Sequence, residues 1–426
     1  MKHTNLYTQK PPSILQLEVT KNCNNACIMC HKGQVPEGQD FDRTDIKEFY
    51  INQVKPIYRF LKHAMLFGDG EPMAYRGFWD IVRDIREAAP KCCIDFINNG
   101  SMMHEANIQR CLDYNVSHLG LSMGGASPET HNYIRRLSSF DEVVKNYQNL
   151  RDMKAERKTL EPYVTALIVV MQTNLKELPD FVRLARDTGW IKIEFQKLFI
   201  THSMVANEEV MDAEAEPIFE ECSRIAKSAG LGFHHYPIES GCNFDTNVSG
   251  NLINHLHPLF KPKFLGDITY KGYCKYRQPW NTVYVLHDGK VVPDCHWWTS
   301  VREVEINECG QLDENTNILN IWNGPIYQEI RDRIQKGQIL PQCRGCGLAG
   351  GVVDEFRSAE TDHTNPDQEK VLLCGIEEQV EMVQLDISKI NRKNRVSQLS
   401  DTPSLNAIMK EAGITDFVSK REYVYR

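Results

Sequence analysis

The sequence predicts an α/β fold in which a parallel sheet is covered by helices on its outer side. Between Ile14 and Phe199, six short β-like runs alternate with longer amphipathic stretches. This alternation is typical of βαβ units, in which a crossover helix joins two parallel strands. The composition supports a large core, because 41% of the residues are hydrophobic and 25% are charged, as in ordinary globular proteins.

Each expected element has a local basis. Strands are predicted at the short apolar runs Leu15–Thr20, Ala64–Phe67, Cys93–Asn98, His118–Ser122, Tyr163–Met171 and Ile191–Gln196. Helices are predicted where apolar residues recur with helical spacing, at Asp45–Lys62, Phe78–Ala88, Glu105–Tyr114, Glu142–Lys158 and Leu175–Asp187. Ser127 before Pro128, and Ser139 three residues before Glu142, are signals of a helix N-terminus. Gly189 is suited to end the helix that precedes it.

The first and last of these strands carry polar residues on one face. Lys192, Glu194 and Gln196 alternate with apolar residues, and Gln16, Glu18 and Thr20 do the same. Strands in a closed α/β core are apolar on both faces. The pattern therefore predicts a polar lumen that holds water or a ligand. The alternative is that these strands lie at solvent-facing edges.

The chain changes character after residue 199. A helix is expected at Ala213–Ser228, and residues 266–355 are rich in cysteine and glycine, with only short strands such as Thr282–Leu286. A metal centre can replace the missing apolar core there. We predict an N-terminal arm (1–13), a core (14–200), a bridging region (201–265), a metal-binding module (266–355) and a polar extension (356–426), with a helix at Ser404–Ala412.

Charge and hydropathy narrow the class of protein. The net charge is −8, no apolar run approaches the ~20 residues of a membrane helix, and the N-terminus has no apolar signal-peptide core. These features predict a cytoplasmic protein that binds neither nucleic acid nor membrane. Fourteen cysteines are too many for a reducing compartment unless some of them bind metal.

The strongest motif is Cys23-x3-Cys27-x2-Cys30, directly after the first predicted strand. Three thiolates in one loop can bind three irons of a [4Fe–4S] cluster and leave the fourth iron open. A zinc knuckle or three buried thiols are the alternatives. The second strand is followed by Gly68-Asp69-Gly70-Glu71-Pro72, in which the glycines allow the backbone to approach a ligand closely.

These motifs, in this order, resemble the radical S-adenosylmethionine (SAM) superfamily. The resemblance implies a partial (β/α)6 TIM-like barrel, in which the open iron chelates SAM and an electron from the cluster cleaves it to a 5′-deoxyadenosyl radical. It also implies contacts with SAM in two groups. Gly68, Gly70, Glu71 and Pro72 match the family's G-E-P motif, while Met29, Asn98, Ser122, Arg135 and Gln196 lie at further expected contact positions. Gly124 replaces an aspartate that is usual in the family.

A second constellation consists of Cys274, Cys295, Cys343 and Cys346. The spacing alone allows one [4Fe–4S] cluster or one tetrahedral zinc site. The arrangement is similar to the C-terminal SPASM/twitch extensions of radical SAM enzymes. Because the C-x5-C-x3-C continuation of the full SPASM form is missing after Cys346, the resemblance implies the shorter twitch form, with one auxiliary [4Fe–4S] cluster on four cysteines.

Three further residues are candidates for the chemistry. Asp294 and His296 flank Cys295 and could serve as a base, although surface or supporting roles are the alternative. Cys242 could return a hydrogen atom, as thiols do in radical epimerases, or could be a buried hydrophobic residue.

The resemblance implies a radical SAM oxidoreductase that receives electrons from a flavodoxin- or ferredoxin-type reductant. Residues 1–13 are too few for a leader-peptide-binding domain, so we expect a small-molecule substrate (a sugar, aminocyclitol or nucleoside) and net dehydrogenation. The alternatives are an epimerase or dehydratase, a peptide or protein maturase of the sulfatase-maturase type, and a non-catalytic iron–sulfur or zinc scaffold.

Overall fold

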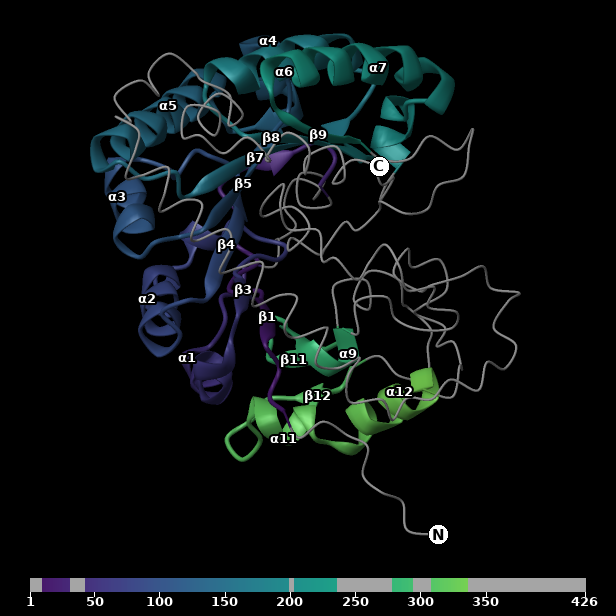
Figure 1. Cartoon of the computed structure of the whole chain (residues 1–426). Helices are drawn as coiled ribbons and strands as arrows, with labels where there is room; N and C mark the ends of the chain where they lie inside the picture. The colour runs from purple at the N-terminus through teal and green to yellow at the C-terminus, as the bar shows by residue number, and fades with distance from the viewer. Residues whose placement is uncertain (1–9, 31–42, 199–202, 236–277, 294–307, 336–426) are drawn as a thin grey trace.

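The fold of the chain is centred on one ten-stranded sheet. A computed structural model describes residues 10–30, 43–198, 203–235, 278–293 and 308–335. The strand order is β12-β11-β10-β1-β3-β4-β5-β7-β8-β9. From β10 to β9 every neighbouring pair is parallel, whereas β11 and β12 are antiparallel additions at one edge. Figure 1 shows that the sheet is curved and that α2, α3, α5, α6 and α7 lie along its outer side.

The strands of the predicted core follow one another in the sheet in chain order. They are β1 (Ile14–Leu17), β3 (His63–Met65), β4 (Cys93–Asn98), β5 (His118–Met123), β7 (Tyr163–Val170) and β8 (Lys192–Lys197). The sheet also contains β9 (Gly232–His235), β10 (Thr282–Val285), β11 (Lys290–Val292) and β12 (Gly310–Gln311), and a separate two-stranded sheet joins β2 (Ala26–Cys27) to β6 (Arg135–Arg136). The α/β fold and the (β/α)6 strand order predicted from the sequence are confirmed.

The helices lie close to their predicted places. They are α1 (Glu48–Val54), α2 (Phe78–Ala88), α3 (Glu105–Asp113), α4 (Pro128–Ile134), α5 (Phe140–Arg157), α6 (Leu178–Asp187), α7 (Asp212–Ala229), α9 (Gln278–Asn281), α11 (Ile318–Trp322) and α12 (Pro325–Gln335). Shorter 3₁₀ segments are η2 (Lys55–Phe60), η3 (Pro72–Ala74), η4 (Leu175–Glu177) and η5 (Ser203–Glu208). The predicted helix at Ser404–Ala412 lies outside the described residues.

The predicted helix-end signals are present. The hydroxyls of Ser127 and Ser139 accept hydrogen bonds from backbone N–H groups in the first turns of α4 and α5. Gly189 follows α6 with a φ of 75°, the left-handed conformation that glycine adopts at little cost. Among the described residues, no helix is long and apolar enough to cross a membrane.

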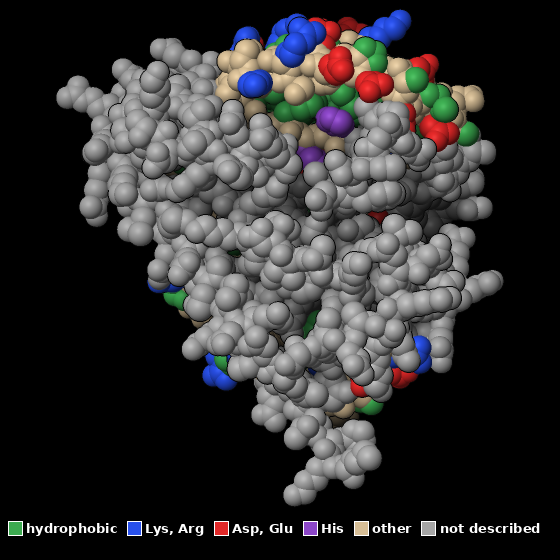
Figure 2. All heavy atoms as spheres, turned by 45° about the vertical axis from the view of Figure 1, so that its right-hand side comes forward, with side chains coloured by type: hydrophobic (Ala, Val, Ile, Leu, Met, Phe, Trp, Pro, Cys, Tyr) green, Lys and Arg blue, Asp and Glu red, His purple; other side chains and the backbone are tan. Residues whose placement is uncertain are grey.

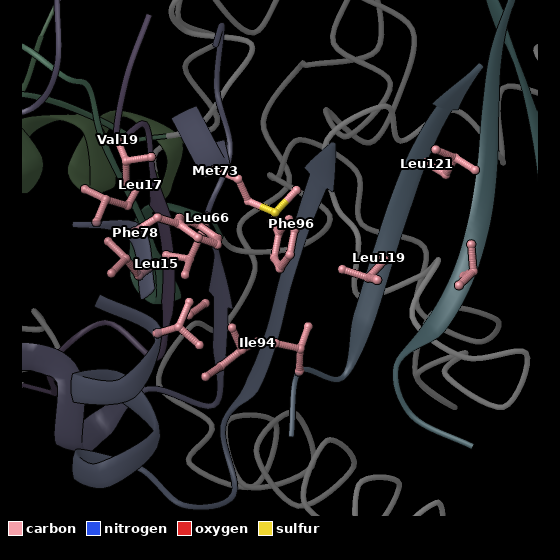
Figure 3. Packing of buried hydrophobic residues seen from close by; sticks show 14 of the residues in the cluster. Leu15, Leu17, Val19, Leu66, Met73, Phe78, Ile94, Phe96, Leu119 and Leu121 are labelled. Atoms are coloured by element: carbon pink, nitrogen blue, oxygen red, sulfur yellow. The ribbon is translucent and has the colours of Figure 1, made fainter. Parts of the chain in front are cut away.

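The main hydrophobic core lies between the sheet and the helices. Alternate strand residues point outward into it, including Leu15 and Leu17 on β1, Ile94 and Phe96 on β4, and Leu119 on β5. Figure 3 shows these side chains gathered with Phe78 of α2 and Met73. Burial of apolar surface at about 25 cal/mol per Å² makes this layer the main stabilising element of the fold.

The opposite face of the sheet carries buried polar residues beside a small apolar cluster that contains Ile14, Met65 and Ile97. Asp95, His118, Thr165, Lys192 and Glu194 are all buried there and alternate along their strands with the core-facing residues. His63 Nε2 lies 3.0 Å from Asp95 Oδ1, and His118 Nε2 lies 2.8 Å from Thr165 Oγ1. Pairing of this kind allows charged groups to be buried. The sheet therefore has an apolar outer face and an inner face on which hydrogen-bonded polar residues lie beside apolar ones. In the space-filling view of Figure 2, the described side chains at the top of the molecule include exposed acidic and basic residues of the outer helices.

Two features of the sheet differ from the expectation. Strand β9 lies in the segment predicted as a bridge, where it extends the sheet next to β8. Strand β10, within the predicted metal-binding module, pairs in parallel with β1. The module is thus joined to the core by backbone hydrogen bonds. The domain boundaries themselves stay a prediction.

Candidate functional site

The cysteine loop follows β1 and is fixed on one side by β6. Cys27 pairs with Arg135 in the β2–β6 ladder, and the N–H of Ile28 donates to the carbonyl of Ile134 at 2.9 Å. Cys27 is buried, and Cys23 and Cys30 are half-buried. The three predicted iron ligands therefore lie in one short, anchored loop at the carboxyl end of β1, where active sites of parallel α/β folds are found.

The Gly68–Pro72 segment packs directly against this loop. A Cβ atom at Gly70 would overlap the carbonyl oxygen of Thr20 and would lie 2.7 Å from that of Asn22. The N–H of Glu71 donates to the same Asn22 oxygen at 2.8 Å. Glycine is therefore required at position 70 because the cysteine loop, a part of the same chain, occupies the space of a side chain.

The Glu71 carboxylate ties two strand ends together. It accepts hydrogen bonds from the N–H of Asn99 at 2.8 Å and from that of Met73 at 3.4 Å. Burial raises the pKa of Glu71 to about 7, although these two N–H groups and the charge of Arg135 oppose the rise. In the described residues Glu71 thus acts on the site by holding the loop after β4. Its predicted contact with SAM stays a prediction.

Asn98 and Asn99 point to opposite sides of the sheet. Asn98 lies on the core-facing side of β4 with Ile94 and Phe96, and its amide exchanges hydrogen bonds with the Tyr147 hydroxyl of α5 at 3.0 and 3.1 Å. The side chain of Asn99 donates to Asn24 Oδ1 at 2.8 Å and lies 4.0 Å from Cys23 Sγ. Of these two asparagines, Asn99 therefore lies next to Cys23. Asn99 was not among the predicted contacts, although strand alternation from Phe96 would have found it.

Arg135 places a cation beside the cysteine loop. Its Nη1 lies 3.7 Å from Cys27 Sγ, and its Nε is buried with no hydrogen-bond partner among the described residues. Burial raises the pKa of the Cys27 thiol, and the Arg135 charge opposes this rise. Arg135 therefore favours the thiolate, which is the form that binds iron.

His131 forms hydrogen bonds with the backbone that follows β5 and with Ser138. Its Nδ1 accepts the N–H of Gly124 at 3.2 Å, so its Nε2–H donates to Ser138 Oγ at 3.1 Å. Burial, with the nearby charge of Arg135, lowers the pKa of His131 to about 3. The imidazole is therefore neutral at physiological pH and positions the Gly124 backbone after β5.

Ser122 and Gln196 lie on the inner face of the sheet, and Met29 lies in the cysteine loop. Ser122 is on the inner face of β5, and Gln196 is on the inner face of β8, where its Nε2 lies 3.4 Å from Glu194 Oε1. Met29 packs on a small apolar cluster that contains Ile28 and Met171. Their contacts with SAM stay predictions.

The cysteine loop carries the donor set of an iron–sulfur cluster. Its three thiolates could each bind a different iron of a [4Fe–4S] cluster. Asn25, which was not among the predicted site residues, has both polar side-chain atoms buried with no hydrogen-bond partner in the part of the chain that the structure describes. A buried amide left unpaired costs about 1–3 kcal/mol, so a bound polar group beside Asn25 would stabilise this loop.

The other predicted site residues lie outside the described residues. These are the four cysteines of the second constellation, the flanking base candidates and the candidate hydrogen donor: Cys274, Cys295, Cys343, Cys346, Asp294, His296 and Cys242. Their assignments stay predictions. Of this module the structure describes β10, β11, β12, α9, α11 and α12.

Comparison with known proteins agrees with this geometry. Residues 17–185 match the model of the radical SAM superfamily, and residues 274–347 match that of the SPASM iron–sulfur cluster-binding domain. A tungsten-containing aldehyde ferredoxin oxidoreductase cofactor-modifying protein of Pyrococcus furiosus is 22% identical over 78% of this chain and 87% of its own length. An AdoMet-dependent heme synthase of Methanosarcina barkeri is 24% identical over 79% of this chain and 91% of its own length.

Solved structures show the same fold. Streptococcus suis SuiB bound to S-adenosylmethionine superposes with a TM-score of 0.53 at 14% identity, over 75% of this chain and 68% of that chain. The protein anSMEcpe with bound AdoMet superposes with a TM-score of 0.52 at 15% identity, over 88% of this chain and 99% of that chain. The two family matches imply SAM, a [4Fe–4S] cluster and auxiliary iron–sulfur binding. This chain therefore contains a radical SAM domain at residues 17–185 and a SPASM iron–sulfur cluster-binding domain at residues 274–347.

Proposed function

We propose that this radical SAM enzyme removes two hydrogens from a small, polar, non-peptide substrate at the carboxyl ends of its strands. The observation that carries the proposal is the parallel pairing of β10 with β1. Because parallel strands end at the same edge of a sheet, the turn after β10 lies at the edge that holds the cysteine loop. Strands β10 and β11 (residues 282–292), which we call the SPASM hairpin, therefore lie at the edge of the sheet at which SAM is expected to bind.

That placement suits an oxidation. Bound SAM and its cluster supply hydrogen abstraction, and a fully ligated auxiliary cluster can accept the electron that oxidation releases. The chain must supply a base for the proton, and Asp294 or His296 beside Cys295 is our candidate. An epimerase or dehydratase has no net oxidation and needs no such acceptor, whereas an epimerase needs a hydrogen donor such as Cys242.

The inner face of the sheet suits a hydroxylated or aminated substrate. Ser122, Glu194 and Gln196 provide hydrogen-bond donors and acceptors along β5 and β8, and burial lowers the pKa of Lys192 beside Glu194. Polar groups of this kind discriminate strongly between substrates, because the wrong substrate leaves them unpaired. A sugar, an aminocyclitol or a nucleoside has matching chemistry.

Some of the relatives favour a non-peptide substrate without identifying it. Two that align over more than three quarters of both chains are named for modifying a cofactor and for synthesising heme, and a third, which aligns over 63% of this chain and 79% of its own length, is named GTP 3′,8-cyclase. Relatives named mycofactocin maturase align over only 42% of this chain. A peptide or protein maturase is therefore our second candidate.

The test is the mass change of the product. Anaerobically reconstituted protein, with dithionite and SAM, is incubated with pools of sugars, aminocyclitols, nucleosides and peptides, and products are analysed by mass spectrometry. We expect a small-molecule product lighter by two hydrogens. Cys343→Ala should still form 5′-deoxyadenosine but should not oxidise the substrate, whereas Cys374→Ala, outside both motifs, should do both. An unchanged mass with inverted stereochemistry, loss of water, or reaction of peptides alone would overturn the proposal.

A further inference from the structure

Glu18 lies between the Gly68–Pro72 loop and the SPASM hairpin. It follows β1 directly and is 1% exposed. Its Oε1 accepts the N–H of Asp69 at 2.9 Å. Its Oε2 accepts the N–H of His287 at 3.2 Å and lies 2.8 Å from His287 Nδ1. One buried carboxylate therefore uses one oxygen for each of two segments that are more than 200 residues apart in the chain.

Both segments are fixed closely against this side chain. A Cβ atom at Gly68 would lie 2.5 Å from Glu18 Cγ, so the backbone of the Gly68–Pro72 loop packs directly against the Glu18 side chain. On the other side, the N–H of Glu18 donates to the carbonyl of Val285 at 2.9 Å, and Leu286 pairs with Lys290 across the hairpin turn. A shift of the hairpin must therefore move the carboxylate, and the carboxylate must move the Asp69 backbone.

The chemistry of the bridge defines its donors. An ionised carboxylate only accepts hydrogen bonds, so the ring nitrogen of His287 that faces Glu18 carries a hydrogen. Hydrogen bonds to an ionised acceptor are about twice as strong as neutral ones. Losing the Nδ1–H donor would leave a buried carboxylate oxygen with only the longer bond to the His287 N–H.

We propose that Glu18 and His287 form a positioning bridge through which the SPASM hairpin sets the affinity of the Gly68–Pro72 loop for SAM. The bridge acts through the backbone of Asp69 and does not touch the reacting atoms. The inference rests on the family assignment and is independent of the proposed substrate. Its test measures SAM binding without substrate, so its failure is distinguishable from a failure of the proposed dehydrogenation.

The test uses two amide replacements that differ in where the donor lies. In His287→Asn the side-chain NH2 takes the place of Nδ1–H, and in His287→Gln it takes the place of Nε2. The full-length protein with its clusters is titrated anaerobically with SAM by calorimetry, and iron per chain is measured for each variant. Lys290→Ala, which changes an exposed side chain of the same hairpin, is the control.

We expect His287→Asn and Lys290→Ala to bind SAM as the wild type does. His287→Gln should bind about tenfold more weakly, which corresponds to about 1.4 kcal/mol, with unchanged iron. Glu18→Gln should also weaken binding, and adding His287→Gln to it should have little further effect, because the two residues act through one bridge. Equal affinities of His287→Asn and His287→Gln would overturn the proposal, and so would fully additive effects of Glu18→Gln and His287→Gln.

Discussion

Replacement of Glu71 by glutamine should make the free energy of unfolding of the apoprotein depend less on pH. The Glu71 carboxyl is buried, and its pKa is raised from 4.5 to about 7. A raised pKa means that folding favours the protonated acid. The stabilising effect is therefore complete below pH 4.5 and is lost as the pH rises through 7. A glutamine side chain at this position carries no charge at any of these pH values and lacks this dependence.

The expected magnitude follows from the two pKa values. With 4.5 in the unfolded chain and about 7 in the fold, the wild type loses about 2 kcal/mol of stability between pH 5.5 and pH 8 through this one group. Glu71→Gln also weakens the hydrogen bond from Asn99 or that from Met73, because an amide has only one acceptor oxygen. That cost is nearly independent of pH and cancels when the two conditions are compared.

The assay is urea denaturation of wild-type and variant apoprotein at the two pH values. The free energy of unfolding of each protein is obtained from the midpoint and the slope of its transition. Relative to the wild type, the variant should become more stable by about 2 kcal/mol when the pH is raised from 5.5 to 8. All other titrating groups are shared and cancel. A difference that stays constant across this range, or moves toward glutamate at the higher pH, would refute the account of Glu71 as a buried carboxyl that folds preferentially in its neutral form.

Three further changes test other parts of the site. Gly70→Ala has no room for its Cβ atom against the cysteine loop. It should therefore bind SAM at least tenfold more weakly, or by about 1.4 kcal/mol, in anaerobic calorimetry. A Gly70→Ala variant that binds SAM as tightly as the wild type would contradict the observed packing. Asp95→Asn removes the buried carboxylate that lies 3.0 Å from His63 Nε2 and should cost about 3–5 kcal/mol of stability in urea denaturation. Because the pKa of Asp95 is lowered, that loss should shrink as the pH falls through its folded value, and a loss that is independent of pH would count against an ionised Asp95. Arg135→Leu removes the cation 3.7 Å from Cys27 Sγ and should shift the midpoint potential of the SAM-binding cluster to more negative values in an EPR-monitored redox titration. Arg135→Lys should give an intermediate potential. An unchanged potential in Arg135→Leu would show that this charge does not act on the cluster.

The sequence predicted the parts of the fold that local signals specify. Helix α2 was predicted with its observed bounds because Phe78–Ala88 has a clean helical repeat, and Ser127 and Ser139 cap their helices as expected. The shared side of Lys192, Glu194 and Gln196 on β8 was also predicted, because alternation in a strand determines which residues share a side.

The unpredicted features depend on long-range pairing. Strand β10 pairs with β1 across more than 260 residues, and no local signal identifies that partner. Strand β9 is short and contains His234 and His235, so its polar composition concealed its place beside β8. Asn99 was missed for a different reason: the motif comparison pointed to Asn98, whereas strand alternation places Asn98 toward α5.

The most direct test of the whole account is SAM cleavage by the anaerobically reconstituted protein. With dithionite and SAM, the wild type should form 5′-deoxyadenosine, measured by liquid chromatography and mass spectrometry. The Cys23→Ala, Cys27→Ala and Cys30→Ala variants should each form none, because each removes one of the three thiolates that bind the cluster. Formation of 5′-deoxyadenosine by a variant that lacks all three cysteines would contradict the assignment of this loop as the SAM-binding cluster site.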